Sequence, residues 1–146
     1  MTEPARSDAP IVWMSFDLVG DSFDPDVVTQ RLGIRPTSQH RAGDSIRAGL
    51  GRRQHDRWRV TVGPREVDDV GGMVDELLAS LESARPKLRG VCQAFGLGPT
   101  ILCAVEPKSS RVPDVTFSAK AIQWAAEIGC AISVDLMLWR EESGGQ

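Results

Sequence analysis

The chain has 146 residues, a length that suits one domain. Hydrophobic residues make up 41% and charged residues 25% of it, a balance that excludes wholesale disorder and indicates a packed core. The formal net charge is −3, and no apolar run approaches the roughly 18 residues of a membrane-spanning helix, so we expect a cytoplasmic protein without a membrane partner.

A single domain is predicted at residues 11–139, with disordered tails at 1–10 and 140–146. The first tail carries charges of both signs and two prolines, but no apolar run of the kind a signal peptide needs. The first domain segment, Ile11–Val19, alternates apolar and polar residues and predicts a half-buried strand.

A short helix is predicted next, because Asp24 is a typical N-cap, Pro25 suits the first helical position and Gly33 suits the end. Residues 35–56 show almost no apolar periodicity and predict a long loop, with room for a strand or hairpin fragment. Alternation around Trp58 to Val62 then predicts a second strand, which ends at Gly63-Pro64.

An amphipathic helix is predicted at 66–83, and Pro86 separates it from a second helical segment that ends at Gly96. Residues 100–105 predict a third strand, and 114–117 predict a short fourth strand in a hairpin with it.

The last predicted elements are a helix that begins after Ser118 and ends at Gly129, and a strand at 131–139. In that strand, alternate apolar residues are expected to face the core. They are Ile132, Val134, Leu136 and Leu138.

This order of elements predicts the α+β class: a two-layer sandwich with a mostly antiparallel or mixed sheet and helices on one face. The segments VVTQRLGI and IQWAAEIGC share a helix-glycine-apolar ending, and each follows a strand. The shared ending favours a ferredoxin-like variant of that architecture.

Several segments carry a family resemblance. They are Phe23-Asp24-Pro25 to Thr29, then Leu32-Gly33-Ile34-Arg35-Pro36-Thr37, then Gly43-Asp44, and the strand with Trp58. Together they resemble the DUF4279 domains of bacteria. The resemblance implies a stand-alone domain and brings no established activity, cofactor or catalytic residue. One departure is the end of the last strand, Met137-Leu138-Trp139. The resemblance leads us to expect an aromatic residue such as tyrosine there, and this chain contains no tyrosine at all.

Positive charge is concentrated between Arg35 and Arg59, where seven arginines stand against two aspartates. Guanidinium groups grip phosphate or carboxylate oxygens bidentately, so this segment predicts a site for an anionic small ligand. The candidate ligands of the anion are Arg35, His40, Arg41, Arg47, Arg52, Arg53 and His55. The alternative is a solvated loop whose arginines pair with acidic residues of the same chain. Nucleic acid is disfavoured, because the pI is acidic and no stacking series of aromatic residues accompanies the arginines.

Two aspartates, Asp17 and Asp135, lie on the polar faces of the first and last predicted strands. If those strands are neighbours, the two carboxylates could approach one another and act in acid/base chemistry. The alternative is an exposed sheet face or salt bridges to the arginines. Trp13, Trp58 and Trp139 also fall at strand positions, and on the same surface they would form a face for a ligand or a protein.

No cofactor and no metal are expected, because the two histidines lie in one arginine-rich segment and no Cys-x-x-Cys motif is present. The three cysteines, Cys92, Cys103 and Cys130, sit among apolar neighbours without close spacing and are interpreted as buried thiols.

The sequence favours a binding or interaction module, for example an immunity-like or regulatory partner of another protein, and disfavours an enzyme because no catalytic motif is recognisable. The alternative is a small-anion-binding protein or an enzyme that uses the arginine-rich segment with the strand carboxylates. A third hypothesis is self-association through exposed tryptophans.

Overall fold

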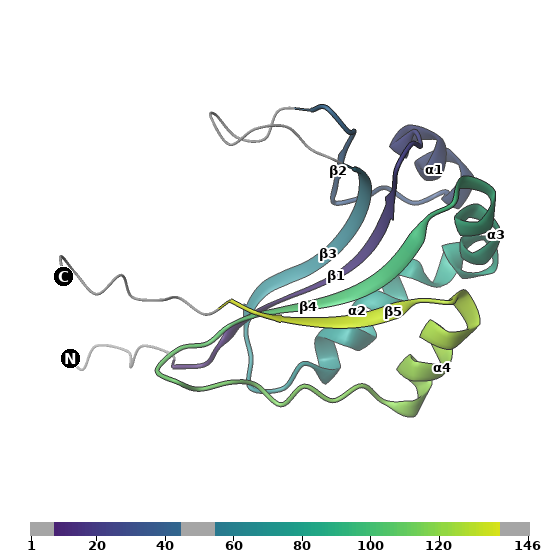
Figure 1. Ribbon diagram of the computed structural model, residues 1–146. Helices are drawn as coiled ribbons and strands as arrows, with labels where there is room; N and C mark the ends of the chain where they lie inside the picture. Colours follow the sequence, from purple (N-terminus) through teal and green to yellow (C-terminus); the bar gives the residue numbers. More distant parts are fainter. Residues whose placement is uncertain (1–7, 45–54, 138–146) are drawn as a thin grey trace.

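The strands of the computed structural model, which describes residues 8–44 and 55–137, form one mixed five-stranded sheet in the order β2-β3-β1-β4-β5 (Figure 1). All neighbouring strands are antiparallel except β4 and β5, which are parallel. The strands are β1 (Ile11–Gly20), β2 (Ser38–His40), β3 (Asp56–Glu66), β4 (Gly98–Glu106) and β5 (Ala131–Leu136).

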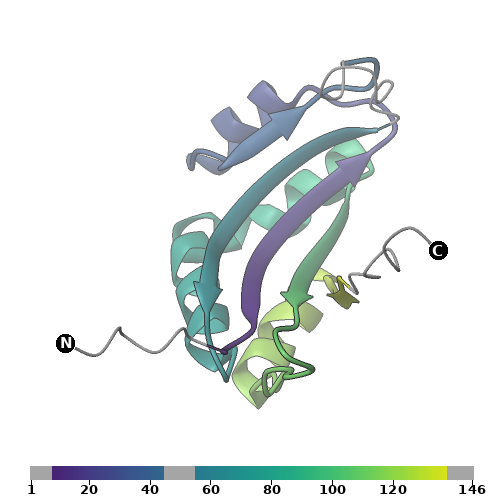
Figure 2. The ribbon, with the colours of Figure 1, turned by 90° about the vertical axis from the view of Figure 1, so that its left-hand side faces the viewer.

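The helices all pack on one face of this sheet, as Figures 1 and 2 show. They are α1 (Pro25–Leu32), α2 (Gly71–Leu81), a 3₁₀ turn (Glu82–Ala84), α3 (Arg85–Phe95) and α4 (Ala119–Ile128). The predicted two-layer α+β sandwich with helices on one face is therefore confirmed.

The core lies between the sheet and this helix layer, and β1 is at its centre. Val12, Met14, Phe16 and Leu18 alternate along β1, and each is fully buried. The edge of the Phe16 ring meets the ring of Trp124 in α4 at 5.8 Å between centroids, with an interplanar angle of 84°. The period-two pattern of the sequence thus fixes which face of β1 receives the helices.

Local sequence determines the ends of α1 and α4 as predicted. The Asp24 carboxylate accepts a hydrogen bond from the Asp26 backbone N–H, and Gly33 ends α1 in the left-handed region at φ 72°. Ser118 accepts from the Ala121 backbone N–H at the start of α4, and Gly129 ends that helix at φ 75°. As predicted, the helical region around Pro86 is divided into two helices, α2 and α3, and Pro86 lies in the first turn of α3.

Two predicted boundaries, the end of β3 and the start of α2, are wrong. β3 does not end at Gly63-Pro64 but continues to Glu66, since a register shift between Val12 and Met14 lets ten-residue β1 pair along its length. The helix predicted from residue 66 begins only at Gly71, because residues before it bond to other segments: the Val67 N–H donates to the Pro10 carbonyl and the Val70 N–H to the Asp114 carbonyl.

The short strand predicted at 114–117 is absent from the described part of the chain. Asp114 instead forms a single bridge to Asp69, and its backbone N–H donates to the Asp68 carbonyl at 2.7 Å. The Val70 N–H donates to the Asp114 carbonyl at 3.1 Å, so this segment crosses the entrance of α2 rather than forming a hairpin with β4.

The topology contains one split β-α-β unit and one ordinary parallel unit. β3 and β4 are both antiparallel to β1, which lies between them, so β3 and β4 run parallel to each other. β4, α4 and β5 then form a crossover between adjacent parallel strands. The split unit is what the fold has in common with ferredoxin-like proteins, and β5 extends the sheet beyond it.

The apolar residues of β5 are exposed, although they were expected to be in the core. Ile132, Val134 and Leu136 are in register with the buried residues of β4 and therefore share the helix-covered face. They are nonetheless 37%, 48% and 49% exposed, because β5 lies at the edge of the sheet, outside the cover that the helices give to β1 and β4. Leu138 lies outside the described residues.

The predicted tails fall almost entirely outside the described residues. Pro10 is described and is tied to the domain, since its carbonyl accepts a hydrogen bond from the Val67 backbone N–H at 3.1 Å. Within residues 8–44 and 55–137, no helix has the length and apolar character needed to cross a membrane.

Candidate functional site

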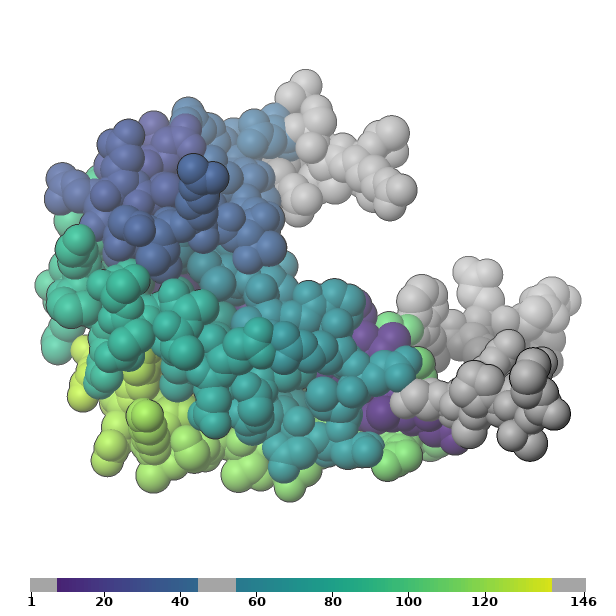
Figure 3. Space-filling model, turned by 180° about the vertical axis from the view of Figure 1, so that it is seen from behind, coloured from purple at the N-terminus to yellow at the C-terminus, as the bar shows by residue number. Residues whose placement is uncertain are grey.

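The face of the sheet opposite the helices is open and concave. Figure 2 looks onto this face, with the helices behind the strands. Figure 3 shows the hollow in profile, between the blue end that holds α1 and β2 and the opposite end with the purple start of β1. No helix or strand of the described residues covers this surface, which we call the open face.

The register of the strands defines which residues share the open face. Around its centre, Ser15 of β1 lies between Thr61 of β3 and Leu102 of β4, and Trp13 lies beside Ala104. Trp13 and Leu102 are half-buried. The open face thus has an apolar centre as well as polar residues.

An ion pair between Asp17 and Arg59 occupies the next row of the open face. The Arg59 Nε and Nη2 atoms each donate to one Asp17 carboxylate oxygen at 2.7 Å, and Asp17 is only 5% exposed. A bidentate pair of this kind satisfies both planar groups. Arg59 and Asp17 are therefore engaged with each other.

The expected approach of Asp17 and Asp135 does not occur. β4 lies between β1 and β5, with Asp17 opposite Thr100 and Asp135 opposite Ala104. Two strand spacings and four residues of strand rise separate the two aspartates by about 16 Å. They cannot act as a pair of catalytic carboxylates, and Asp135 instead shares a row with Trp13 across Ala104.

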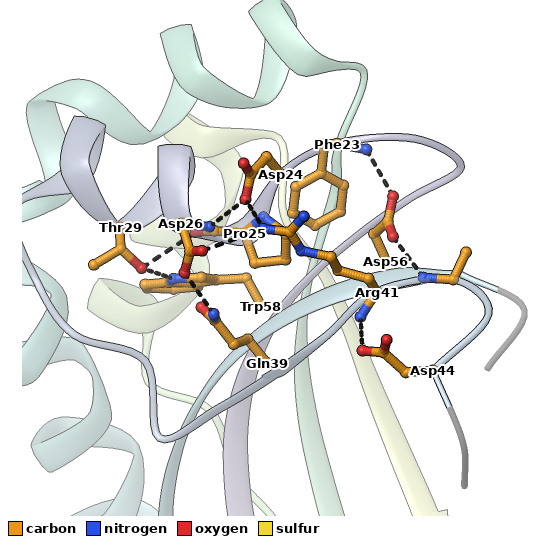
Figure 4. A network of polar contacts seen from close by, with 11 residues as sticks. Phe23, Asp24, Pro25, Asp26, Thr29, Gln39, Arg41, Asp44, Asp56 and Trp58 are labelled. Atoms are coloured by element: carbon orange, nitrogen blue, oxygen red, sulfur yellow. Dashed lines mark hydrogen bonds and ion pairs between the residues drawn. The ribbon is translucent and has the colours of Figure 1, made fainter. Parts of the chain in front are cut away.

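The three tryptophans do not form one surface. Trp13 lies on the open face, whereas Trp58 points to the opposite face of the sheet and is fully buried. Its indole Nε1 donates to the Thr29 hydroxyl at 3.0 Å, which ties β3 to α1 (Figure 4). Trp139 lies outside the described residues. The prediction that Trp58 belongs to an exposed binding face is therefore wrong, since the alternation of β3 places it in the core.

In the described part of the arginine-rich segment, basic side chains form ion pairs with acidic residues of the same chain. Arg41 Nη2 lies 2.7 Å from Asp24 Oδ1 and 3.2 Å from Asp26 Oδ2, and its backbone N–H donates to Asp44 (Figure 4). His55 Nδ1 lies 3.4 Å from Asp21 Oδ1. These contacts are the alternative considered above, in which cations of this segment pair within the chain.

The remaining candidates of this segment are dispersed. Arg35 is exposed after α1, and His40 lies in β2 opposite Arg57 on the open-face side of the sheet. Arg47, Arg52 and Arg53 lie outside the described residues. The described cations therefore do not converge on one point.

Asp56 is an important polar residue that sequence reasoning missed. It is 6% exposed, and its carboxylate accepts from the backbone N–H of Phe23 at 2.7 Å and of Ala42 at 2.6 Å. It thereby joins the start of β3 to the entrance of α1 and the exit of β2 (Figure 4). Its position just before an alternating strand is the only sequence feature that marks it.

The cysteine thiols are held in the protonated form. Burial raises the pKa of Cys92 to about 11 and that of Cys130 to about 12, and it also raises the pKa of Cys103. All three are free thiols. A protonated thiol is a poor nucleophile and a poor metal ligand, so this chemistry does not favour a reactive cysteine. Among the described residues, no three His, Cys, Asp or Glu side chains gather as a metal site would require.

A second concavity, with a volume of about 950 Å³, lies between α2 and α4 on the helix side. Leu78, Ala121 and Trp124 contribute its apolar lining, and an Arg85–Glu127 ion pair lies on its rim. It is on the opposite side of the sheet from the open face, and none of the candidate site residues from the sequence lines it.

Comparison with known proteins gives one match. No similar protein was found among curated proteins or among solved structures. The family model described as "Domain of unknown function (DUF4279)" matches residues 10–139, which is most of the chain and includes the open face, both sheet edges and every helix of the described residues. The chain therefore belongs to the DUF4279 family.

Proposed function

We propose that this domain is a binding module whose open face holds a segment of another protein, in a regulatory or neutralising role. The observation that carries the proposal is the half-buried Trp13 and Leu102 at the centre of a concave sheet face without a cover among the described elements. The exposed side of an antiparallel sheet normally carries polar residues, and aromatic anchors in a recess are the residues that dominate protein interfaces.

The charges of this face favour a polypeptide over a free anion. Asp17 and Arg59 neutralise each other in the row next to its centre, and Arg41 is paired with Asp24 and Asp26 outside it. An anion would have to compete with carboxylates that are already bound, whereas a polypeptide can use apolar contacts with Trp13 and hydrogen bonds to the strand side chains.

Site-specific photo-crosslinking in the native host tests this proposal. A photoreactive residue replaces Leu102 on the open face, and the control carries it in place of Arg89, which is exposed on α3 on the other side of the sheet. We expect position 102 to capture a defined protein in stoichiometric amount and position 89 to capture none. Identical products from both positions would overturn the proposal.

A substitution then assigns the captured protein to the apolar centre. Trp13→Ser should weaken binding of the purified partner about 10-fold or more, since truncated aromatic anchors commonly cost 2 kcal/mol or more. Arg89→Ser should leave the affinity unchanged. Equal effects of the two substitutions would show that the partner binds elsewhere.

A further inference from the structure

Among residues 8–44 and 55–137, β5 is an outermost strand of the sheet and its outer edge has no strand beside it. All six residues of β5 are exposed, and no other described strand pairs with its outer side. Natural edge strands are usually very short, bulged, interrupted by proline or studded with lysine, because unpaired backbone groups bind other strands. β5 has none of these features and carries one charged residue, Asp135.

The apolar surface of the molecule is concentrated beside this edge. Of the five large hydrophobic residues that are exposed in the described chain, Ile132, Val134 and Leu136 belong to β5, and Ile122 belongs to α4. Ile122 lies on the flank of α4 away from α2, since the residues that line the groove with α2 are on the opposite side of the helix. The fifth, Val112, lies in the segment between β4 and α4 and belongs to neither α4 nor β5.

We infer that β5 pairs antiparallel with β5 of a second copy of this chain, through a two-fold axis at Val134. In this register Val134 faces Val134, and Ile132 faces Leu136, so both apolar rows become cross-strand pairs on the helix side. A strand continues the sheet only if residues that lie opposite each other point to the same face. The two-fold register satisfies this condition, because the residues it places opposite each other are both on the helix side or both on the open-face side.

The charge of the edge agrees with this register. On the open-face side, Asp135 of one copy lies opposite Ser133 of the other, where a hydroxyl can donate to the carboxylate. An axis at Asp135 would instead place two carboxylates face to face, which is destabilising. The register at Val134 thus places Ile132, Val134 and Leu136 of one copy opposite apolar residues of the other copy. It also keeps the two Asp135 carboxylates apart.

A second copy suits this edge because the edge is complementary to itself. A two-fold interface requires one patch to supply both partners, and β5 supplies an unpaired backbone, an apolar row and a polar row in the same six residues. The flank of α4 with Ile122 adds apolar area beside the strand. The resulting dimer has one continuous sheet with both open faces on the same side, and its formation does not depend on the function proposed for those faces.

Sedimentation equilibrium of the full chain tests the dimer. We expect the wild-type protein to have the mass of two chains and Val134→Lys to have the mass of one, with an unchanged circular dichroism spectrum. Val112→Lys is the matched control, since Val112 is 58% and Val134 48% exposed, and it should remain a dimer. A wild-type chain that is monomeric up to about 1 mM would overturn the inference. A Val134→Lys variant that remains dimeric would also overturn it.

Cysteine crosslinking tests the register. Under mild oxidation, Val134→Cys should give a covalent dimer, because residue 134 faces its own copy, whereas Ile132→Cys should not, because residue 132 faces Leu136. The wild-type chain, whose cysteines are buried or half-buried, gives the background. Crosslinking by Ser133→Cys but not by Val134→Cys would show that the axis lies elsewhere.

Discussion

The two edges of the sheet are built in opposite ways. The β2 edge is a three-residue polar strand held to α1 by side-chain contacts, among them Gln39 Nε2 to Asp26 Oδ1 at 2.7 Å and the Arg41 ion pairs. The β5 edge is six residues long and apolar on one side. Both are outermost strands of one sheet, yet only the first has the shortness and polarity that discourage pairing with other strands.

The two edge strands are therefore held in different ways, one by side-chain contacts to a helix and the other by backbone pairing with its neighbouring strand. At the β2 edge, Trp58 and Asp56 of β3 reach out of the sheet to α1 and to the chain around it. At the β5 edge, the strand is attached mainly through its parallel pairing with β4. The following predictions test this contrast, first on the anchored edge.

Removal of the Trp58 side chain should have the largest effect. Trp58 is fully buried and also donates to Thr29, so Trp58→Ala should lower the free energy of unfolding by about 3–5 kcal/mol. Urea denaturation measures the change. Trp58→Phe retains most of the ring contacts and should cost clearly less; equal losses would mean that the ring packing is unimportant.

The Asp56 carboxylate should rank second. Asp56→Ala leaves the buried backbone N–H of Phe23 and the partly buried backbone N–H of Ala42 without their acceptor, and we expect a loss of about 2–3 kcal/mol. Asp56→Asn keeps one acceptor oxygen and should recover part of it. Hydrogen exchange should speed up at residues 23 and 42 in the alanine variant, and unchanged exchange there would contradict this role.

The thiols beside the β5 edge should make stability depend on alkaline pH. Below pH 9.0, the ordinary pKa of a cysteine, the thiols are protonated in both states. As the pH rises from there towards 11, the unfolded chain loses protons that folded Cys92 and Cys130 retain, so the free energy of unfolding should fall by up to ~1.4 kcal/mol per pH unit for each thiol. Thermal unfolding across this range measures the slope, and Cys92→Ala should reduce it. A slope that Cys92→Ala leaves unchanged would contradict the assignment.

The Arg41 ion pairs should have the smallest effect. Both partners are largely exposed, with side-chain exposures of 52% for Arg41 and 44% for Asp24. Arg41→Ala should therefore change the free energy of unfolding by less than about 1 kcal/mol, and the change should shrink in high salt. Arg35→Ala, also at an exposed arginine, is the control. A salt-independent loss of several kcal/mol would show that charge, rather than Trp58 and Asp56, anchors the β2 edge.

Sequence reasoning reached the elements whose pattern is local. The alternation of β1 predicted its buried face, and the caps Asp24, Gly33, Ser118 and Gly129 predicted both ends of α1 and of α4, because these features depend on backbone geometry within a few residues. The candidate site depended on neighbours in space and was harder to predict. Trp58 was placed on a surface, and Asp56 was not recognised at all.

The sequence by itself determined the α+β class, the family, and which residues of each strand share a face. Only the tertiary structure decided the strand order, which separates Asp17 from Asp135, joins Asp17 to Arg59 and leaves the apolar row of β5 at an edge. The physical reason is that periodicity records the direction of a side chain relative to its own strand, whereas burial and ion pairing depend on which strand or helix lies beside it.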